Sequence, residues 1–516
     1  MTSTYYRLFW VARFLFASLA LIFALSLTNV SAQEKASSDF NFAECKAKAE
    51  QGDAESQLIV GLCYSLGEGG VKQDDKEALK WLQMSAKQKN YQAQYILSVF
   101  CMEGRGLPKN EELGKKLLIN ASNGGYAEAQ FEYASLLFEE KKTNEAIPLL
   151  KKSADQGFVP AQTALGSYYV NTLKAGSKEF EEGLTLLSLA AAQGDVNAQM
   201  TLGGTLVDQK KVSDGVVWLE IAGMNGEKSI PELLKKITIT ANDCYEISSA
   251  FFLGDGIIPK SYEKFKYWGE RAIAQGNTDA LFTLGVYYFG GCNHEQNLKK
   301  GIDYLTKAAD QGNAEAQALL AIAYRNGRGV PKDYKKAIEF LQKSAKQQNP
   351  GAYKQLGFTS LFGIGITSKE ETTRKLFDKA VEMKEPTSTI FMDYCKKNSI
   401  SLENGAAVMK QLEDSAKGGD PVAQFLIGEC YSDGYGKPMD EKLMAVYYNS
   451  AAKQNYAPAL TALSWIYEMG IYVKENRETA IKLALNAANQ GDQEALSYLA
   501  TVGNVEMENQ APTQKK

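Results

Sequence analysis

The sequence predicts an all-α protein, a superhelical α/α solenoid of about a dozen helix-turn-helix repeats. One observation is a small or polar residue that opens a helical pattern, and from Ala280 to Ala495 these openings recur every 35 or 36 residues. A second observation is a glycine eleven positions after many openings, at Gly67, Gly104, Gly254, Gly291, Gly327, Gly363, Gly434 and Gly470. A repeated unit of this length holds two helices, so the pattern indicates an array of helix pairs.

The first helix of each unit is predicted from the spacing of its small and apolar residues. Ala316, Leu320 and Tyr324 lie four residues apart and therefore share one side of a helix. The glycine that follows, Gly327 in this unit, ends the helix because glycine adopts the left-handed conformation without steric cost. Asn398 stands where one unit lacks this glycine, and we expect it to adopt the same conformation.

The second helix is predicted to begin at a polar residue whose side chain accepts a hydrogen bond from a free backbone N–H group. Such residues stand at the expected positions, namely Asp74, Asn110, Ser261, Asn297, Asp333, Ser368, Asn404, Asp440 and Asn476. A glycine again ends most of these helices, as Gly312 does. Lys89 and Gln348 replace that glycine, and we expect the asparagine after each of them to take the left-handed conformation.

One unit, AEAQALLAIAYRNGRGVPKDYKKAIEFLQKSAKQQN, shows these features together. It resembles a Sel-1-like repeat (SLR), a relative of the tetratricopeptide repeats, in four marks. They are the turn of Gly327, Gly329 and Val330, the Asp333 cap, the pair Lys336 and Ala337, and the alanine-rich end of the second helix. The resemblance extends over roughly residues 42–500 and departs from the pattern near Lys141, Thr172, Gln209 and Ser399, where the glycine-rich turn is missing.

The chain is predicted to begin with a secretory signal peptide, residues 1–32. Arg7 and Arg13 precede an uncharged run over residues 14–30, and small residues lead to a cleavage position after Ala32. The alternative is an uncleaved membrane anchor, since the run is nearly long enough to span a bilayer. Cleavage would place the mature protein in the periplasm or outside the cell.

The rest of the chain divides by the regularity of its repeats. Residues 33–52 are predicted to form a linker and a capping helix, residues 53–226 an irregular N-terminal array, and residues 243–501 a regular C-terminal array. An insertion over residues 227–242 separates the two arrays. Residues 502–516 are polar and without a pattern, which is typical of a disordered tail.

Composition argues against several classes of partner. Apolar residues make up 45% and charged residues 23% of the chain, as in ordinary folded soluble proteins. Removing residues 1–32 takes away Arg7 and Arg13 and no acidic residue, so the net charge changes from −4 to −6. A mildly acidic chain with dispersed lysines is a poor nucleic-acid binder. We expect contact with a membrane only if the N-terminal segment stays uncleaved.

The seven cysteines are an odd number, so at least one is not in an intramolecular disulfide. The register of the helices leaves two pairings open. Cys45 faces Cys63 across the first antiparallel helix pair, and Cys395 and Cys430 lie on first helices of adjacent units. A disulfide requires the two alpha carbons to lie within about 7 Å, and the alternative is that these residues are buried free thiols.

Catalytic and cofactor chemistry find little support. His294 is the single histidine, which leaves no second imidazole for a metal site or a proton relay. A serine-x-x-lysine motif occurs at Ser261-Tyr262-Glu263-Lys264, but no lysine-threonine-glycine motif accompanies it, and Ser261 falls at a helix-cap position. We therefore predict no enzyme activity and no cofactor. An enzyme acting on cell-wall peptide or β-lactams, as in the cysteine-rich SLR proteins, remains the alternative.

Large side chains recur two and six positions after the helix openings and form a ladder along the first helices. The candidate partner-binding residues at these positions are Tyr95, Phe131, Phe282, Phe358, Phe425 and Trp465. In related helical repeats the first helices line the concave surface, so such side chains would anchor a partner there. The alternative is that the rings pack between neighbouring units.

Together these features predict a non-catalytic, periplasmic or secreted scaffold that binds a protein or peptide on its concave face. A secreted factor that interacts with a host would share the same solenoid and differ in destination and partner. The identity of the partner does not follow from the repeat pattern, because solenoids are reused with different surface residues.

Overall fold

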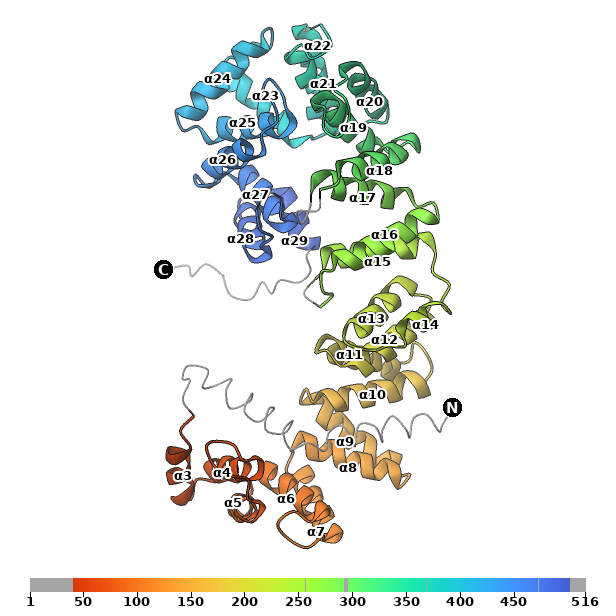
Figure 1. Cartoon of the computed structure of the whole chain (residues 1–516), viewed down its shortest axis with the longest axis vertical. Helices are drawn as coiled ribbons and strands as arrows, with labels where there is room; N and C mark the ends of the chain where they lie inside the picture. The colour runs from red at the N-terminus through yellow and green to blue at the C-terminus, as the bar shows by residue number, and fades with distance from the viewer. Residues whose placement is uncertain (1–39, 256, 292–295, 368, 472, 502–516) are drawn as a thin grey trace. The chain divides into compact units, whose positions relative to one another are not determined.

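The computed structural model describes residues 40–501 apart from 256, 292–295, 368 and 472, and these residues form helices and turns without a strand (Figure 1). The prediction of an all-α repeat array is therefore confirmed. Within the same residues no helix is both long enough and apolar enough to cross a membrane. The predicted signal peptide and C-terminal tail, together with Cys292 and His294, lie outside the described residues.

The described residues form two compact units, residues 40–210 with 218–232 and residues 211–217 with 233–501. We call them the N-terminal and the C-terminal array. The first contains α3 (Phe42–Glu50), α4 (Ala54–Leu66), α5 (Asp75–Lys87), α6 (Tyr91–Glu103), α7 (Glu111–Asn123), α8 (Ala127–Glu139), α9 (Thr143–Asp155), α10 (Val159–Thr172), α11 (Lys178–Ala192) and α12 (Val196–Asp208). Two helices, α13 (Val212–Met224) and α14 (Ile230–Leu234), lie where the units divide.

The C-terminal array contains fifteen helices. They are α15 (Ala241–Leu253), α16 (Tyr262–Ala274), α17 (Thr278–Gly290), α18 (Leu298–Asp310), α19 (Ala314–Asn326), α20 (Tyr334–Lys346), α21 (Pro350–Leu361), α22 (Glu370–Glu382), α23 (Pro386–Lys397), α24 (Gly405–Lys417), α25 (Pro421–Asp433), α26 (Glu441–Ala452), α27 (Ala457–Met469), α28 (Arg477–Ala488) and α29 (Gln493–Thr501). Helices α15 to α22 and α25 to α28 pack as successive pairs, whereas α23 packs against α22 and α25, and α24 against α25. In the C-terminal array the first helix of each repeat carries an odd number, whereas in the N-terminal array it carries an even number, from α4 to α12.

The predicted caps of the second helices are confirmed wherever the structure describes them. The side chains of Asp74, Asn110, Ser261, Asn297, Asp333, Asn404, Asp440 and Asn476 accept hydrogen bonds from the backbone of the first turn. Ser368 lies outside the described residues. Ser261 accepts from the backbone N of Lys264 at 3.3 Å, so its hydroxyl serves as a helix cap. Gly327 has φ +71°, the left-handed conformation that its position required.

The expected left-handed asparagines are wrong, and the structure shows why. Ser399 (φ 54°), and not Asn398 (φ −98°), takes this conformation, while the Asn398 side chain donates to a carbonyl of its own helix. Lys89 itself has φ 65°, because the following Asn90 caps α6 by accepting from the backbone N of Ala93 at 2.9 Å. Gln348 is left-handed for the same reason (φ 61°), since Asn349 caps α21. A cap bond satisfies a buried donor, and this outweighs the strain of one left-handed residue.

Neighbouring repeats are joined by a recurring glutamine bond. A glutamine one position after the helix opening donates to the backbone carbonyl eight residues earlier, at the end of the preceding second helix, in Gln57, Gln94, Gln130, Gln162, Gln199, Gln317 and Gln424. Five of these side chains also accept from a glutamine of the next second helix, as Gln317 does from Gln347 at 3.0 Å. These bonds satisfy carbonyls that a helix end leaves free.

The six cysteines within the described residues are free thiols, so neither of the two pairings that the sequence left open is formed. Cys63, Cys395 and Cys430 are buried in the packed interior, and Cys45 is half-buried. Burial raises the pKa of the Cys63 thiol to about 12, and burial likewise raises that of Cys395 to about 12. These side chains therefore act as small apolar core residues.

We expect Cys63 and Cys395 to resist alkylation in the folded protein. At pH 8 a thiol with a pKa near 12 is deprotonated in only about one molecule in 10⁴, and the thiolate is the reactive form. Mass spectrometry after a short iodoacetamide treatment should find both thiols unmodified in the native protein and fully modified in guanidinium. Rapid modification of either thiol in the native state would contradict the buried placement.

Candidate functional site

The predicted ladder residues lie on first helices, and three of them pack against the next repeat. Tyr95 of α6 lies 5.5 Å from the ring of Tyr126, and Phe131 of α8 lies 5.5 Å from the ring of Phe158. Phe425 of α25 contacts Tyr456 in the same way, at 5.7 Å. Each second ring stands at the N-cap of the next first helix and makes no side-chain cap bond: Tyr126, Phe158 and Tyr456. These three pairs fit the alternative prediction, in which the rings pack between neighbouring repeats.

The other candidates differ in exposure. Phe358 is buried, with its ring 4.9 Å from Phe377 and 4.8 Å from Tyr435. Phe282 is half-buried beside the core of α17 to α19. Trp465 of α27 is 37% exposed, and its ring meets that of Tyr498 edge-on. A partner contact stays a prediction for the exposed and half-buried members of the ladder.

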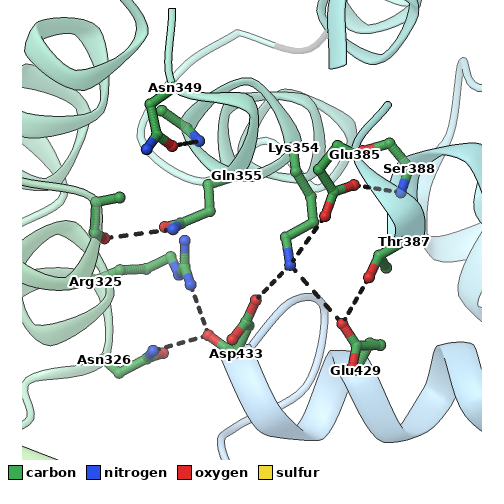
Figure 2. A network of polar contacts seen from close by, with 12 residues as sticks. Arg325, Asn326, Asn349, Lys354, Gln355, Glu385, Thr387, Ser388, Glu429 and Asp433 are labelled. Carbon is green, nitrogen blue, oxygen red and sulfur yellow. Dashed lines mark hydrogen bonds and ion pairs between the residues drawn. The ribbon is translucent and has the colours of Figure 1, made fainter. Parts of the chain in front are cut away.

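At one point the ladder carries charges in place of rings. Lys354 of α21 occupies the position of Tyr95 and Phe131, and Glu385, the N-cap of α23, occupies that of Tyr126 and Phe158. The ion pair between Lys354 and Glu385 thus replaces the aromatic pair of other repeats. Two residues of α25, Glu429 and Asp433, and one of α19, Arg325, complete the group. We call Arg325, Lys354, Glu385, Glu429 and Asp433 the inner cluster (Figure 2).

Lys354 lies at the centre of the inner cluster, with three carboxylates around its ammonium group (Figure 2). Its Nζ is 3.6 Å from Glu385 Oε1, 3.8 Å from Glu429 Oε2 and 3.8 Å from Asp433 Oδ2. Burial by itself lowers the pKa of Lys354, but the three carboxylates outweigh it and the pKa is raised. The lysine is therefore charged, at distances longer than those of direct hydrogen bonds.

Two of these carboxylates are held in place by other groups. Glu385 accepts a hydrogen bond from the backbone N of Ser388 and so caps α23. Glu429 accepts from the hydroxyl of Thr387 at 3.1 Å and from the hydroxyl of Tyr448. Burial raises the pKa of Glu429, although Lys354 opposes the shift. The carboxylates thus keep their orientation independently of the lysine.

The cluster also joins helices that are three repeats apart. Arg325 Nη2 and Asn326 Nδ2, at the end of α19, donate to the backbone oxygen of Asp433, at the end of α25, at 2.7 and 2.9 Å. The Arg325 guanidinium lies 4.2 Å from the centre of the Tyr435 ring. Helices three repeats apart meet only if the array curves toward them, so the first helices line the inner face of the C-terminal array.

The inner cluster can recognise charged and polar groups. It holds two cations and three carboxylates, and four of its side chains are 9–19% exposed. Among the described residues no group of three or more histidine, cysteine, aspartate or glutamate side chains is arranged to hold a metal ion. The predicted ladder contains large apolar side chains only, so it does not include Lys354 and Glu429, which occupy the same two positions of their helices. In the sequence, Lys354 and Glu429 can be recognised as charged residues two and six positions after a helix opening.

We expect Glu429→Gln to stabilise the protein increasingly as the pH rises. The raised pKa of Glu429 means that the folded state keeps this proton at a pH where the unfolded chain has lost it. The wild type therefore loses stability as the pH rises above the unfolded pKa, near 4.5, toward the folded pKa. Glutamine resembles the protonated form, so the unfolding midpoints of the two proteins should agree at pH 4 and diverge at pH 8.

Glu371→Gln is the matched control for this experiment, because the pKa of Glu371 is shifted in the opposite direction. Glu371 is exposed on α22, and its hydrogen bond to Lys375 lowers its pKa. A lowered pKa gives stability that is present above the unfolded pKa and is lost as the pH falls. The control should therefore be no more stable than the wild type at pH 8. A Glu429→Gln variant that loses stability at pH 8 would contradict the assigned shift.

Comparison with known proteins identifies the repeat. A sequence profile of the Sel1 repeat matches nine segments, at residues 54–90, 92–126, 127–158, 159–195, 241–277, 278–313, 314–349, 421–456 and 457–492. Residues 350–420, which include Lys354 and Glu385, are not matched, although they also fold into helices, of which α21 and α22 pack as a pair. Two residues of the inner cluster, Lys354 and Glu385, thus lie where the sequence departs from the family pattern, and the other three lie in matched repeats.

Individual relatives are more distant. An uncharacterized protein of Neisseria meningitidis serogroup B is 30% identical over 129 residues, which cover 24% of this chain and 26% of that protein, so the match spans about a quarter of the relative's length. A protective antigen of uropathogenic Escherichia coli with an SLR fold is 23% identical, with 90% of each chain covered and a TM-score of 0.33. A Sel1 repeat protein from Oxalobacter formigenes is 26% identical, with 68% of this chain and 89% of that chain covered and a TM-score of 0.31.

The profile matches cover more than half of the residues, in both arrays. Sel1 repeat proteins generally mediate protein–protein interactions and are typically non-catalytic scaffolds. With its repeated helix pairs, caps and glycine turns, this chain belongs to the Sel1 repeat family.

Proposed function

We propose that this protein is a non-catalytic scaffold that binds a protein or peptide through the inner face of its arrays, in the periplasm or outside the cell. The inner cluster carries the proposal. At ladder positions where other repeats place packed rings, the C-terminal array keeps charged side chains that are partly exposed. Proteins depart from their own structural pattern at functional sites, where some stability is given up.

The chemistry of the inner cluster favours recognition of charged groups. Burying charges costs free energy that a pair of rings would not cost. Charges are useful when a partner supplies the complementary group, because charge-assisted hydrogen bonds give orientation as well as affinity. Trp465, exposed on α27, is the aromatic anchor of the proposed surface.

Affinity capture from a cell-envelope extract tests the binding surface. The mature wild-type chain is compared with Glu429→Gln, which we expect to stay folded, with Trp465→Ala, and with Glu371→Gln, a change at an exposed residue of α22. A protein retained by the wild type and by Glu371→Gln, and lost with Glu429→Gln or Trp465→Ala, supports the proposal. Equal capture by all four proteins contradicts the inner face as the binding surface.

Two further experiments test the compartment and the absence of chemistry. We expect fractionation to find the mature chain in the periplasm or the medium. Recovery from the medium favours the host-interaction alternative, and recovery from the cytosol alone contradicts the proposed compartment. Hydrolysis of nitrocefin by the purified protein would contradict a non-catalytic scaffold, and Ser261, a helix cap, offers no basis for such activity.

A further inference from the structure

The first and last helix pairs of the C-terminal array meet at their turns. Lys260, between α15 and α16, lies against the end of α27 and the turn that follows it. Its Nζ donates to the backbone oxygen of Glu468 at 3.0 Å and pairs with Glu468 Oε1 at 3.0 Å and Glu475 Oε1 at 2.7 Å. The hydroxyl of Tyr262 donates to the other oxygen of Glu475 at 2.8 Å. These partners are more than 200 residues apart in the sequence.

A second contact crosses the same junction in the opposite direction. Arg477, the first residue of α28, donates from Nη1 to the backbone oxygen of Leu253 at 2.8 Å and from Nη2 to that of Gly254 at 2.7 Å. Both carbonyls lie at the C-terminal end of α15, where backbone carbonyls have no hydrogen-bond partner within the helix. Met469 and Ile471 pack beside them against the aromatic core of α16 and α17, and Figure 1 shows α27 beside these helices.

We call Lys260, Tyr262, Glu468, Glu475 and Arg477 the latch. It is well buried for an ionic contact, because Lys260 is only 14% and Glu468 only 3% exposed. The hydroxyl of Tyr498 fixes the second oxygen of Glu468 at 2.8 Å, so the carboxylate is held in position for the lysine. An ordinary surface ion pair has neither this burial nor this network of bonds.

The latch constrains the whole array because of how a solenoid is built. Each repeat contacts its neighbours, and curvature is the sum of small rotations between successive repeats. The latch joins repeats that are six apart, so while it is closed that sum is fixed. The contacts inside the array depend on the same curvature: Arg325 reaches Asp433 across three repeats, and Arg328 pairs with Glu441 at 3.4 Å.

We propose that the latch holds the C-terminal array closed and that a partner reaches the inner cluster fully only when the latch opens. This proposal rests on the proposed function, since it concerns access to the inner cluster. In the closed array Lys354 and the three carboxylates around it are at most 19% exposed. When the latch opens, the rotations between repeats relax, the contacts between α19 and α25 separate, and the charges become accessible. The closed state lowers the apparent affinity by the fraction of molecules that are open.

Hydrogen exchange of the full chain tests the latch without a partner. The double variant Lys260→Met, Arg477→Met is compared with the wild type and with Lys300→Met. Lys300 is a matched control, because its pair with Glu270 joins neighbouring repeats only. We expect amides at the end of α19 and in α25 to exchange at least tenfold faster in the double variant than in either other protein. Faster exchange confined to residues near the substitutions, or equal exchange in Lys300→Met, would overturn the latch.

Two additional measurements separate this proposal from misfolding and from failure of the proposed function. Lys260→Arg keeps the charge and should exchange like the wild type, whereas a merely damaged turn would also affect this variant. The double variant should retain more of a captured partner than the wild type does, and equal or weaker retention contradicts control of access. If the proposed function is wrong, the result is different: a captured partner then binds the wild type and Glu429→Gln equally, both with the latch intact and in the Lys260→Met, Arg477→Met background.

Discussion

Replacing Lys354 by methionine is expected to destabilise the C-terminal array by about 3–5 kcal/mol. Methionine fills the space of the lysine stem but leaves Glu385, Glu429 and Asp433 around an uncharged side chain. Three partly buried carboxylates then repel one another, and removing one partner of a buried ionic group costs more than the group contributes when intact. Because Glu429 already has a raised pKa, part of this cost should disappear as the pH falls and the carboxylates take up protons.

The measurement is denaturant unfolding followed by pulsed hydrogen exchange at α21 and α25, which reads the C-terminal array separately from the N-terminal one. Lys375→Met on α22 is the control, because this lysine pairs with Glu371 and is 73% exposed. Surface substitutions of this kind usually change stability by less than about 0.5 kcal/mol. Similar midpoints for the two variants would show that the inner cluster contributes no more than a surface ion pair.

Gly301→Ala is expected to destabilise the protein by about 1–3 kcal/mol, although alanine ordinarily favours a helix. Gly301 lies in α18, where an added methyl group would lie 2.7 Å from the backbone N of Phe289 and 3.0 Å from its Cα. These are backbone atoms of α17, so neither helix can yield without shifting the pair. The glycine therefore sets how closely the two helices approach.

Gly204→Ala is expected to have the opposite effect and to stabilise the protein. Gly204 lies in the interior of α12, and an added methyl group would meet no atom within 4 Å. Replacing glycine by alanine there should stabilise the N-terminal array by about 0.5–1 kcal/mol, because the unfolded chain loses conformational freedom. Thermal unfolding with exchange readout at α12 and α18 checks both signs. A Gly301→Ala protein as stable as the wild type would show that α17 and α18 have room to separate.

The repeat pattern was predictable because its causes are local. Gly327 is left-handed and Asp333 is a cap because of the bonds of a few neighbouring residues, and both follow from residue type and spacing. Local reasoning was wrong where two local demands compete. Asn90 was expected to adopt the left-handed conformation, but it caps the next helix and leaves the strain to Lys89.

The aromatic ladder shows how far spacing leads toward a candidate site. Lys354 and Glu429 lie at its two offsets, and its role as a partner-binding surface stays a prediction. Spacing left open whether Phe131 would meet a partner or pack between repeats, and its contact with the ring of Phe158 depends on how closely two repeats pack. Because the ladder was defined by large apolar side chains, it did not include the charged residues at the same offsets.

The sequence by itself determined the helices, their caps, most of their turns and the number of residues per repeat, because each depends on interactions within about one turn of helix. The tertiary structure alone decided that Lys354 meets carboxylates of α23 and α25 and that Lys260 meets Glu468 and Glu475. These contacts join residues that are tens to hundreds of positions apart. They depend on the curvature of the array. This curvature is the sum of small rotations over several repeats, so the sequence of a single repeat does not determine it.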